Sequence, residues 1–174
     1  ALLRVALALS TLTQKPFKIT NIRAGKPDGG GLKPQHLTAI NALKEMSGAK
    51  TSDIALRCKD MWFHPGKIKS GTYVIDTKTA GSITLLSQSL ILPCLFAPGK
   101  VTLEIHGGTC GKWQASVEYL QNVLIPQLSK FVKKIDVKII KRGYYPKGGG
   151  KVIVDISPKI KQKSFTHLSE FFQE

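Results

Sequence analysis

Apolar residues at the start of the chain recur with the spacing of an amphipathic helix, and Pro16 ends that pattern. A strand is expected over 17–22, and a helix over about 36–47 has an apolar residue at every third position. Two short strands are expected next, over 53–57 and 61–64. The hydrophobic pattern of this part therefore predicts the order helix, strand, helix, strand, strand.

The rest of the chain repeats this order with one further strand in front. Its expected elements are a strand over 72–75, a helix over 82–96 capped by Ser82, a strand over 101–105, a helix over 116–133, and strands over 137–140 and 152–154. Two related units result, over about 1–66 and 71–157, and the first strand of the first unit is missing. We expect an α/β (α+β) fold of tandem βαβαββ repeats, with helices packed on one face of a sheet.

The two units are expected to form one domain over 1–158. Residues 159–174 are expected to be a basic tail that begins a region absent from this sequence. The chain opens with an alanine inside a helical pattern, so we also expect a segment to be missing before it. The apolar stretch over 2–12 includes Arg4 and is too short to cross a bilayer, which predicts neither a signal peptide nor a membrane partner.

Charge narrows the class of partner. The net charge is +15, from 26 Lys and Arg against 11 Asp and Glu, which favours a polyanion, most often nucleic acid. The three cysteines are widely spaced and form no Cys-x-x-Cys pair. This spacing argues against a disulfide framework or a zinc site and fits a reducing compartment.

Two glycine-rich connections hold the candidate chemistry. The first, over 22–37, joins a strand to a helix and combines Arg23, Lys26 and Lys33 with several glycines. Glycines allow close backbone approach, and a helix N-terminus with cations beside it suits phosphate; a solvated loop whose glycines relieve strain is the alternative. The second, over 142–151, sets two tyrosines among cations, which suits a single nucleic-acid strand or an ordinary hairpin connection.

Five stretches in this sequence resemble motifs of the RNA 3'-terminal phosphate cyclase family, in that family's order and close to its spacings. They are Ile22-Arg23-Ala24-Gly25, Leu32-Lys33-Pro34-Gln35-His36-Leu37-Thr38, Asp76-Thr77-Lys78-Thr79-Ala80-Gly81-Ser82, Gly107-Gly108-Thr109 and Arg142-Gly143-Tyr144-Tyr145-Pro146-Lys147-Gly148-Gly149-Gly150. Together they cover most of the chain. The resemblance implies an RNA-processing enzyme inside the cell, nuclear in a eukaryote and otherwise cytoplasmic.

The resemblance also implies a reaction. Family members use ATP and a divalent metal, Mg²⁺ or Mn²⁺, to adenylylate a histidine and pass AMP to an RNA 3'-terminal phosphate. The neighbouring 2'-hydroxyl then displaces AMP and leaves a 2',3'-cyclic phosphate. The family's nucleophilic histidine lies far downstream, and none of the four histidines here (His36, His64, His106 and His167) matches it. No catalytic residue is therefore assigned, and the chain is expected to be an incomplete enzyme.

The family's pattern further implies binding residues. Contacts to the nucleotide are expected from Arg4, Arg23, Lys26, Gln35 and Gln88. Contacts to RNA or phosphate are expected from Lys33, His36, Arg142, Tyr144 and Lys147. Alternatives remain for three of them: a salt bridge at a helix end for Arg4, helix capping for Gln35 and a surface polar role for Gln88. Metal ligands and oligomeric state are not assigned.

Departures from the family pattern keep other functions open. Ala115 and Glu118 stand where the family usually has a proline and an aspartate, and the loop after Arg23 is about one residue longer. A catalytically silent cyclase-like protein of ribosome assembly is one alternative, although Pro34-Gln35-His36-Leu37 and Thr79-Ala80-Gly81-Ser82 follow the active pattern. A plain basic RNA-binding module and a fragment too incomplete to fold alone are the others.

Overall fold

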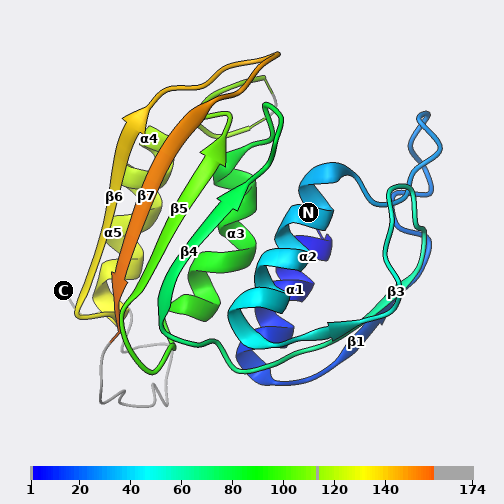
Figure 1. Ribbon diagram of the computed structural model, residues 1–174, viewed down its shortest axis with the longest axis horizontal. Helices are drawn as coiled ribbons and strands as arrows, with labels where there is room; N and C mark the ends of the chain where they lie inside the picture. The colour runs from blue at the N-terminus through cyan, green and yellow to red at the C-terminus, as the bar shows by residue number, and fades with distance from the viewer. Residues whose placement is uncertain (1, 113, 159–174) are drawn as a thin grey trace.

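A computed structural model describes residues 2–112 and 114–158. The first part of the chain forms two helices and three short strands (Figure 1). These are α1 (Leu2–Thr13), β1 (Phe17–Ile19), α2 (Pro34–Ser47), β2 (Lys50–Thr51) and β3 (Met61–His64). Pro34 begins α2, where its missing N–H costs no hydrogen bond, and Gly48 ends it with φ of 71°.

The second part forms four strands and two helical segments. They are β4 (Gly71–Asp76), α3 (Ile83–Cys94), β5 (Val101–Gly107), α4 (Val117–Tyr119), a π-helical turn (Leu120–Leu124), α5 (Ile125–Leu128), a 3₁₀ turn (Ser129–Phe131), β6 (Lys134–Lys141) and β7 (Gly150–Ser157). The side chain of Ser82 accepts a hydrogen bond from the N–H of Leu85, which confirms the predicted cap of α3.

The strands form two sheets, and the predicted α+β class is confirmed. The three-stranded sheet has the order β1-β3-β2 and is antiparallel. The four-stranded sheet has the order β4-β5-β7-β6, in which only β4 and β5 run parallel. The order β1-β3-β2 repeats the order β5-β7-β6, so both sheets follow the same chain path over three strands.

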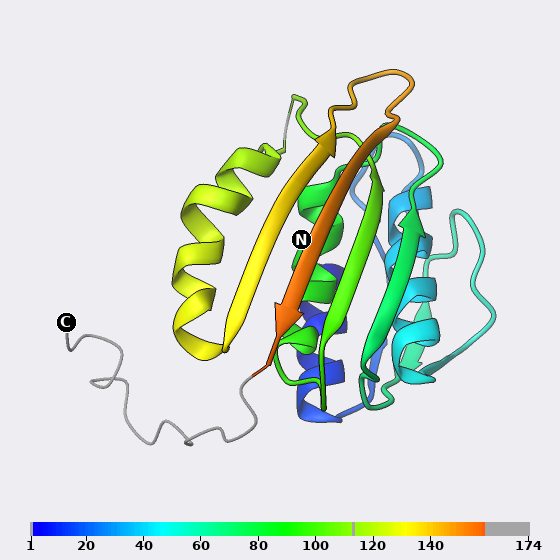
Figure 2. The ribbon, with the colours of Figure 1, turned by 60° about the vertical axis from the view of Figure 1, so that its left-hand side comes forward.

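Each sheet has one covered face and one open face. Figure 2 shows α3 behind the four-stranded sheet, and Figure 1 shows the 117–131 helical segment behind β6 and β7. Val101, Leu103 and Ile105 of β5 are fully buried on that side, and the residues between them are only partly covered. α1 and α2 lie between this unit and the small sheet, where Phe63 of β3 is also fully buried (Figure 1). The helices therefore join the two sheets into one core.

Three expected elements differ from the structure. The strand over 17–22 ends at Ile19, because Asn21 and Arg23 take positive φ values of 54° and 58° in the turn that follows. The strand over 53–57 is wrong: this segment turns at Arg57, whose N–H donates to the Leu32 carbonyl at 2.9 Å. A strand forms at 50–51 instead.

The helix over 116–133 is interrupted near its middle. Pro126 has no N–H to donate to the carbonyl four residues before it. Just ahead of the proline, the N–H of Ile125 reaches the Leu120 carbonyl, five residues back. The helical segment ends at Phe131, two residues before the expected end.

The predicted tail over 159–174 lies outside the described residues, and the domain boundaries stay a prediction. Among residues 2–112 and 114–158, no helix combines the length and the apolar character that crossing a membrane requires.

Candidate functional site

The N-terminus of α2 is the centre on which several predicted site residues converge. His36 lies in its first turn, and the Nδ1 atom of His36 accepts a hydrogen bond from the N–H of Lys33 at 3.0 Å. An accepting Nδ1 carries no proton, so the neutral ring holds its proton on Nε2. Lys33 precedes the helix with its side chain partly exposed.

The environment keeps His36 uncharged at neutral pH. Burial, the largest cause, and the positive charges of Arg23, Arg4 and Lys33 together lower the pKa of His36 to about 4. These cations come from α1, from the loop before α2 and from the residue that precedes α2. The depressed pKa thus reflects the burial of the ring first and the positive charges around this helix end second.

The loop before α2 curls back on itself through three glycines. Gly29, Gly30 and Gly31 have φ values of 80°, 71° and 73°, which L side chains rarely adopt. A Cβ atom on Gly30 would lie 2.5 Å from the carbonyl oxygen of Arg23, and the N–H of Gly31 donates to the Ile22 carbonyl at 2.7 Å. The glycines therefore bring the tip of the loop back toward its own base.

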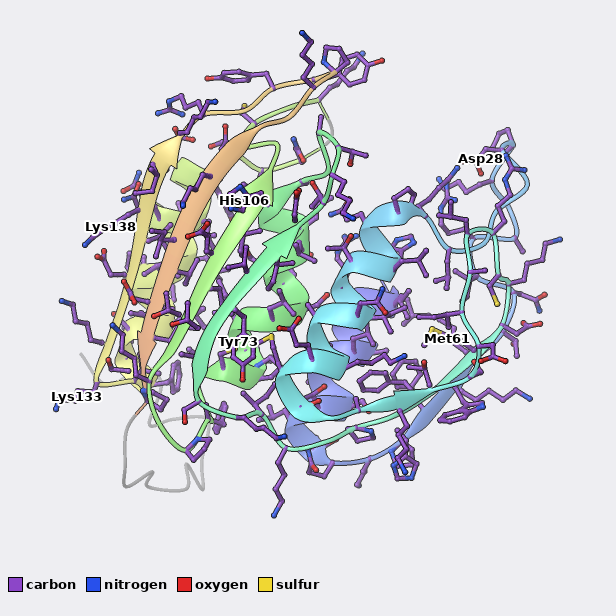
Figure 3. The ribbon with its side chains drawn as sticks, in the orientation of Figure 1. Asp28, Met61, Tyr73, His106, Lys133 and Lys138 are labelled. Atoms are coloured by element: carbon purple, nitrogen blue, oxygen red, sulfur yellow. The ribbon has the colours of Figure 1, made fainter. Side chains whose placement is uncertain are left out.

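This curl places Asp28 between two predicted phosphate ligands. Asp28 Oδ2 lies 3.0 Å from Arg23 Nη2 and 2.7 Å from Lys33 Nζ, and Oδ1 accepts from the N–H of Gly30 at 3.2 Å. Lys33, Arg23 and this backbone bond hold the pKa of the Asp28 carboxyl well below its usual range. Asp28 was not among the predicted site residues, although it is the only acidic residue in the sequence between Arg23 and Lys33. Figure 3 labels it at the projecting loop.

Arg4 and Gln88 meet beside this centre. Arg4 Nε on α1 donates to Gln88 Oε1 on α3 at 3.0 Å, although the residues are 84 positions apart. Partial burial lowers the pKa of Arg4. Within the described part of the chain, Arg4 forms no salt bridge with a carboxylate, so the structure does not support that alternative.

A pocket of about 420 Å³ lies next to the same helix end. It is lined by Gln35, Ala80, Gly81, Ser82, Leu85, Cys110, Gly111, Lys112, Gln114 and Tyr145. Gln35 Nε2 donates to the Ser82 carbonyl at 3.1 Å, which ties the start of α2 to the start of α3. The volume and the mixture of polar and apolar groups suit a small ligand.

The 142–150 connection reaches this pocket through Tyr145 and not through the residues predicted from the motif. Tyr145 is 87% exposed and lines the pocket. Tyr144 and Lys147 are exposed outside the lining, and Arg142 forms an ion pair with Glu118. Tyr145 and Cys110 were therefore missed; Tyr145 stands next to a selected residue, and nothing in the local pattern distinguishes the two tyrosines.

Lys26 does not join the cluster of cations. It is exposed in the loop, and its N–H donates to the Arg23 carbonyl at 3.0 Å. Metal ligands are also not gathered here: over residues 2–112 and 114–158, no three His, Cys, Asp or Glu side chains come together as a possible metal site.

A profile of the family described as RNA 3'-terminal phosphate cyclase matches residues 1–169. The chain belongs to this cyclase family. The resemblance drawn from the five motifs is thereby confirmed.

Archaeal cyclases are similar to this chain along nearly all of it. The protein named RNA 3'-terminal phosphate cyclase in Pyrococcus furiosus is 43% identical over 172 residues, which cover 99% of this chain and 49% of that protein. The one in Caldivirga maquilingensis is 44% identical over 173 residues, covering 97% and 48%. The one in Archaeoglobus fulgidus is 41% identical over 157 residues, covering 90% and 48%. The chain spans about half the length of these cyclases. The expected nuclear location gains no support from them, because archaeal cells have no nucleus.

Proposed function

We propose that this chain forms part of an ATP-dependent RNA 3'-phosphate cyclase, which converts an RNA 3'-phosphate to a 2',3'-cyclic phosphate through adenylylated intermediates. Membership in the cyclase family supports the reaction class. The observation that carries the role of this chain is the convergence of Arg4, Arg23 and Lys33 on the N-terminus of α2. A triphosphate is the polyanion that such a cluster suits best.

Each residue of the cluster has a distinct task in this proposal. The guanidinium of Arg23 holds phosphate oxygens with two parallel N–H donors, and Lys33 adds a point charge. Neutral His36 donates from Nε2, since its Nδ1 is engaged by Lys33. Gln88 holds Arg4 in place through its amide oxygen, and its amide group is available in addition to that of Gln35. Lys26, exposed on the loop, would approach the phosphates only when the loop moves.

The neighbouring pocket would take a nucleoside or the RNA terminus. Tyr145 offers an aromatic face at its rim, and Gln35 offers an oriented amide. Tyr144, Arg142 and Lys147 extend from the same connection and would hold the RNA backbone beyond the pocket. Mg²⁺ or Mn²⁺, when bound to the triphosphate, would neutralise charge during nucleotidyl transfer.

The nucleophile is proposed to lie in another part of the full protein. None of the histidines in this sequence matches the family's nucleophile, and the chain spans about half of its relatives. This chain would then bind ATP without becoming adenylylated.

The test is incubation with radiolabelled ATP and Mg²⁺, with Mn²⁺ in a parallel series, with and without RNA ending in a 3'-phosphate. We expect no protein-linked AMP on this chain and label on a version extended through the downstream half. Label on this chain would contradict the missing nucleophile and make His36 the residue to mutate. Absence of label on both forms would contradict the cyclase assignment and favour the silent RNA-binding branch.

Nucleotide binding by this chain can be tested separately. Replacing Arg23→Gln is expected to weaken ATP binding by about tenfold or more, because a charge-assisted contact to phosphate is lost. Lys138→Gln, on the open face of the four-stranded sheet, is the matched control and should leave the dissociation constant unchanged. Isothermal titration measures both, and equal affinities for the two variants would place the phosphates elsewhere.

A further inference from the structure

The outer face of the three-stranded sheet combines an aromatic ring with cations. Along β3, Met61 and Phe63 are buried, whereas Trp62 and His64 are exposed on the opposite face. Figure 3 labels Met61 on the side of β3 that faces the helices, so the next side chain along the strand points away from them. Trp62 is 45% exposed there.

The strand register places a lysine opposite each of these exposed residues. Lys18 of β1 pairs with Trp62, and Lys50 of β2 pairs with His64. Side chains directly opposite on an antiparallel pair lie about 5 Å apart, and residues two apart on one strand lie about 7 Å apart. The four side chains therefore form one continuous patch, the Trp62 face, defined by Lys18, Lys50, Trp62 and His64.

Charge sets the Trp62 face apart from the open face of the other sheet. On or beside the four-stranded sheet, three lysines are paired with carboxylates: Lys100 with Asp155 at 3.2 Å, Lys151 with Glu104 at 2.7 Å and Lys138 with Asp136 at 3.7 Å. Lys134 and Lys141 of β6 form no ion pair within the described residues. The strands β1, β2 and β3 contain no acidic residue. Within the described residues, neither Lys18 nor Lys50 forms an ion pair.

We propose that the Trp62 face binds a single strand of nucleic acid, and the proposed function identifies that strand as RNA. The indole of Trp62 stacks on a base, while Lys18 and Lys50 neutralise flanking phosphates. A cationic face with an exposed aromatic complements a polyanion that displays unstacked bases. This face points away from α2, so it contacts nucleotides inside the strand and not the terminal phosphate at the helix end (Figure 1).

The test is binding of a fluorescein-labelled single-stranded oligoribonucleotide that ends in a 3'-hydroxyl, followed by anisotropy. Because this probe lacks the terminal phosphate, it does not depend on the cation cluster. Trp62→Ala is expected to weaken binding about tenfold, and Trp62→Phe should restore most of it because a ring can still stack. The double variant K18Q/K50Q should reduce the slope of log K against log salt by about 1.4, since each lysine contributes about 0.7 on a single strand.

Two variants serve as matched controls. Tyr119→Ala removes another exposed aromatic, and Lys138→Gln removes a lysine from the other open face; neither should change RNA affinity. Circular dichroism and thermal melting check the fold of every variant. A wild-type chain that does not bind the probe, or W62A and K18Q/K50Q variants that bind as tightly as the controls, would overturn the proposal. ATP binding by the wild-type chain, W62A and K18Q/K50Q is measured in parallel by isothermal titration, which distinguishes a failure of the nucleotide site from a failure of the Trp62 face.

Discussion

At the scale of single residues, Asp28 is the least expected feature of the site. Its carboxylate lies between Arg23 and Lys33, where the proposed phosphate would bind, and so competes with that phosphate. Asp28→Asn is expected to tighten the binding of ATP or tripolyphosphate by about fivefold, because both cations lose a competing charge. Isothermal titration at low salt measures the effect.

The control is Asp53→Asn, an exposed carboxylate in the segment before β3. It should leave the affinity unchanged. Weaker binding by the D28N variant would mean that Asp28 positions Arg23 for phosphate and does not compete with it.

Glycine 31 provides a stability prediction at the same scale. A Cβ atom on Gly31 would lie 2.2 Å from the carbonyl oxygen of Arg57, and the residue has φ of 73°. Gly31→Ala is therefore expected to lower the free energy of unfolding by about 2–4 kcal/mol. Gly25→Ala, in the same loop with no atom within 4 Å of its added Cβ, should change it by less than about 0.5 kcal/mol. Urea denaturation compares the two, and similar losses would contradict the close approach to Arg57.

At the scale of elements, local signals predicted most of the fold. The strand over 61–64 and the cap at Ser82 are confirmed, because alternation and capping act over a few neighbouring residues. The strand over 53–57 is wrong because its geometry depends on a bond from Arg57 to the distant Leu32 carbonyl. The hydrophobic periodicity of a segment cannot predict a hydrogen bond to a residue so distant in sequence.

In the candidate site, too, features set by neighbouring residues were predicted, and contacts between residues distant in sequence were not. The cations of the loop and the start of α2 could be predicted from sequence, because these residues are close together along the chain. Arg4 and Gln88 were selected only through the family resemblance, and their contact across 84 positions was not predicted. Asp28 and Tyr145 were not predicted, because the position of each depends on how its loop bends. For Asp28, the positive φ values of Gly29–Gly31 bring the carboxylate to Arg23.

The first turn of α2 predicts a pH dependence of stability. The pKa of His36 falls from 6.5 to about 4 in the folded chain, so the unfolded chain binds this proton more tightly. The stabilising contribution is complete above pH 6.5 and is lost as the pH falls toward 4. The loss amounts to about 1–2 kcal/mol after allowance for solvent screening.

His36→Gln isolates this effect, because glutamine can still accept the bond from the N–H of Lys33 without titrating in this range. Chemical denaturation at several pH values should show a smaller loss of stability on acidification for the variant. An unchanged pH dependence would remove His36 as its source.

At the scale of the whole molecule, the excess positive charge is unevenly placed. Lys138 and Lys151 on the four-stranded sheet, and Lys100 beside it, are paired with carboxylates, whereas Lys18 and Lys50 of the Trp62 face form no ion pair within the described residues. In the two proposals, part of the net charge of +15 serves two separate anion-binding surfaces, one at the N-terminus of α2 and one on the outer face of the three-stranded sheet.

One side of α1 carries an exposed apolar surface. Leu2, Val5 and Leu9 are 72%, 50% and 46% exposed and follow one another along the helix at helical spacing. A contiguous apolar stripe binds hydrophobic dyes and promotes association in water. The double variant V5Q/L9Q is therefore expected to lose most dye fluorescence and concentration-dependent association while its melting temperature stays within a few degrees, because these side chains bury little area.

Ile140→Gln, which removes an exposed apolar side chain on β6, is the matched control and should change neither readout. If V5Q/L9Q binds the dye as strongly as the control, the stripe is not the surface that the dye recognises.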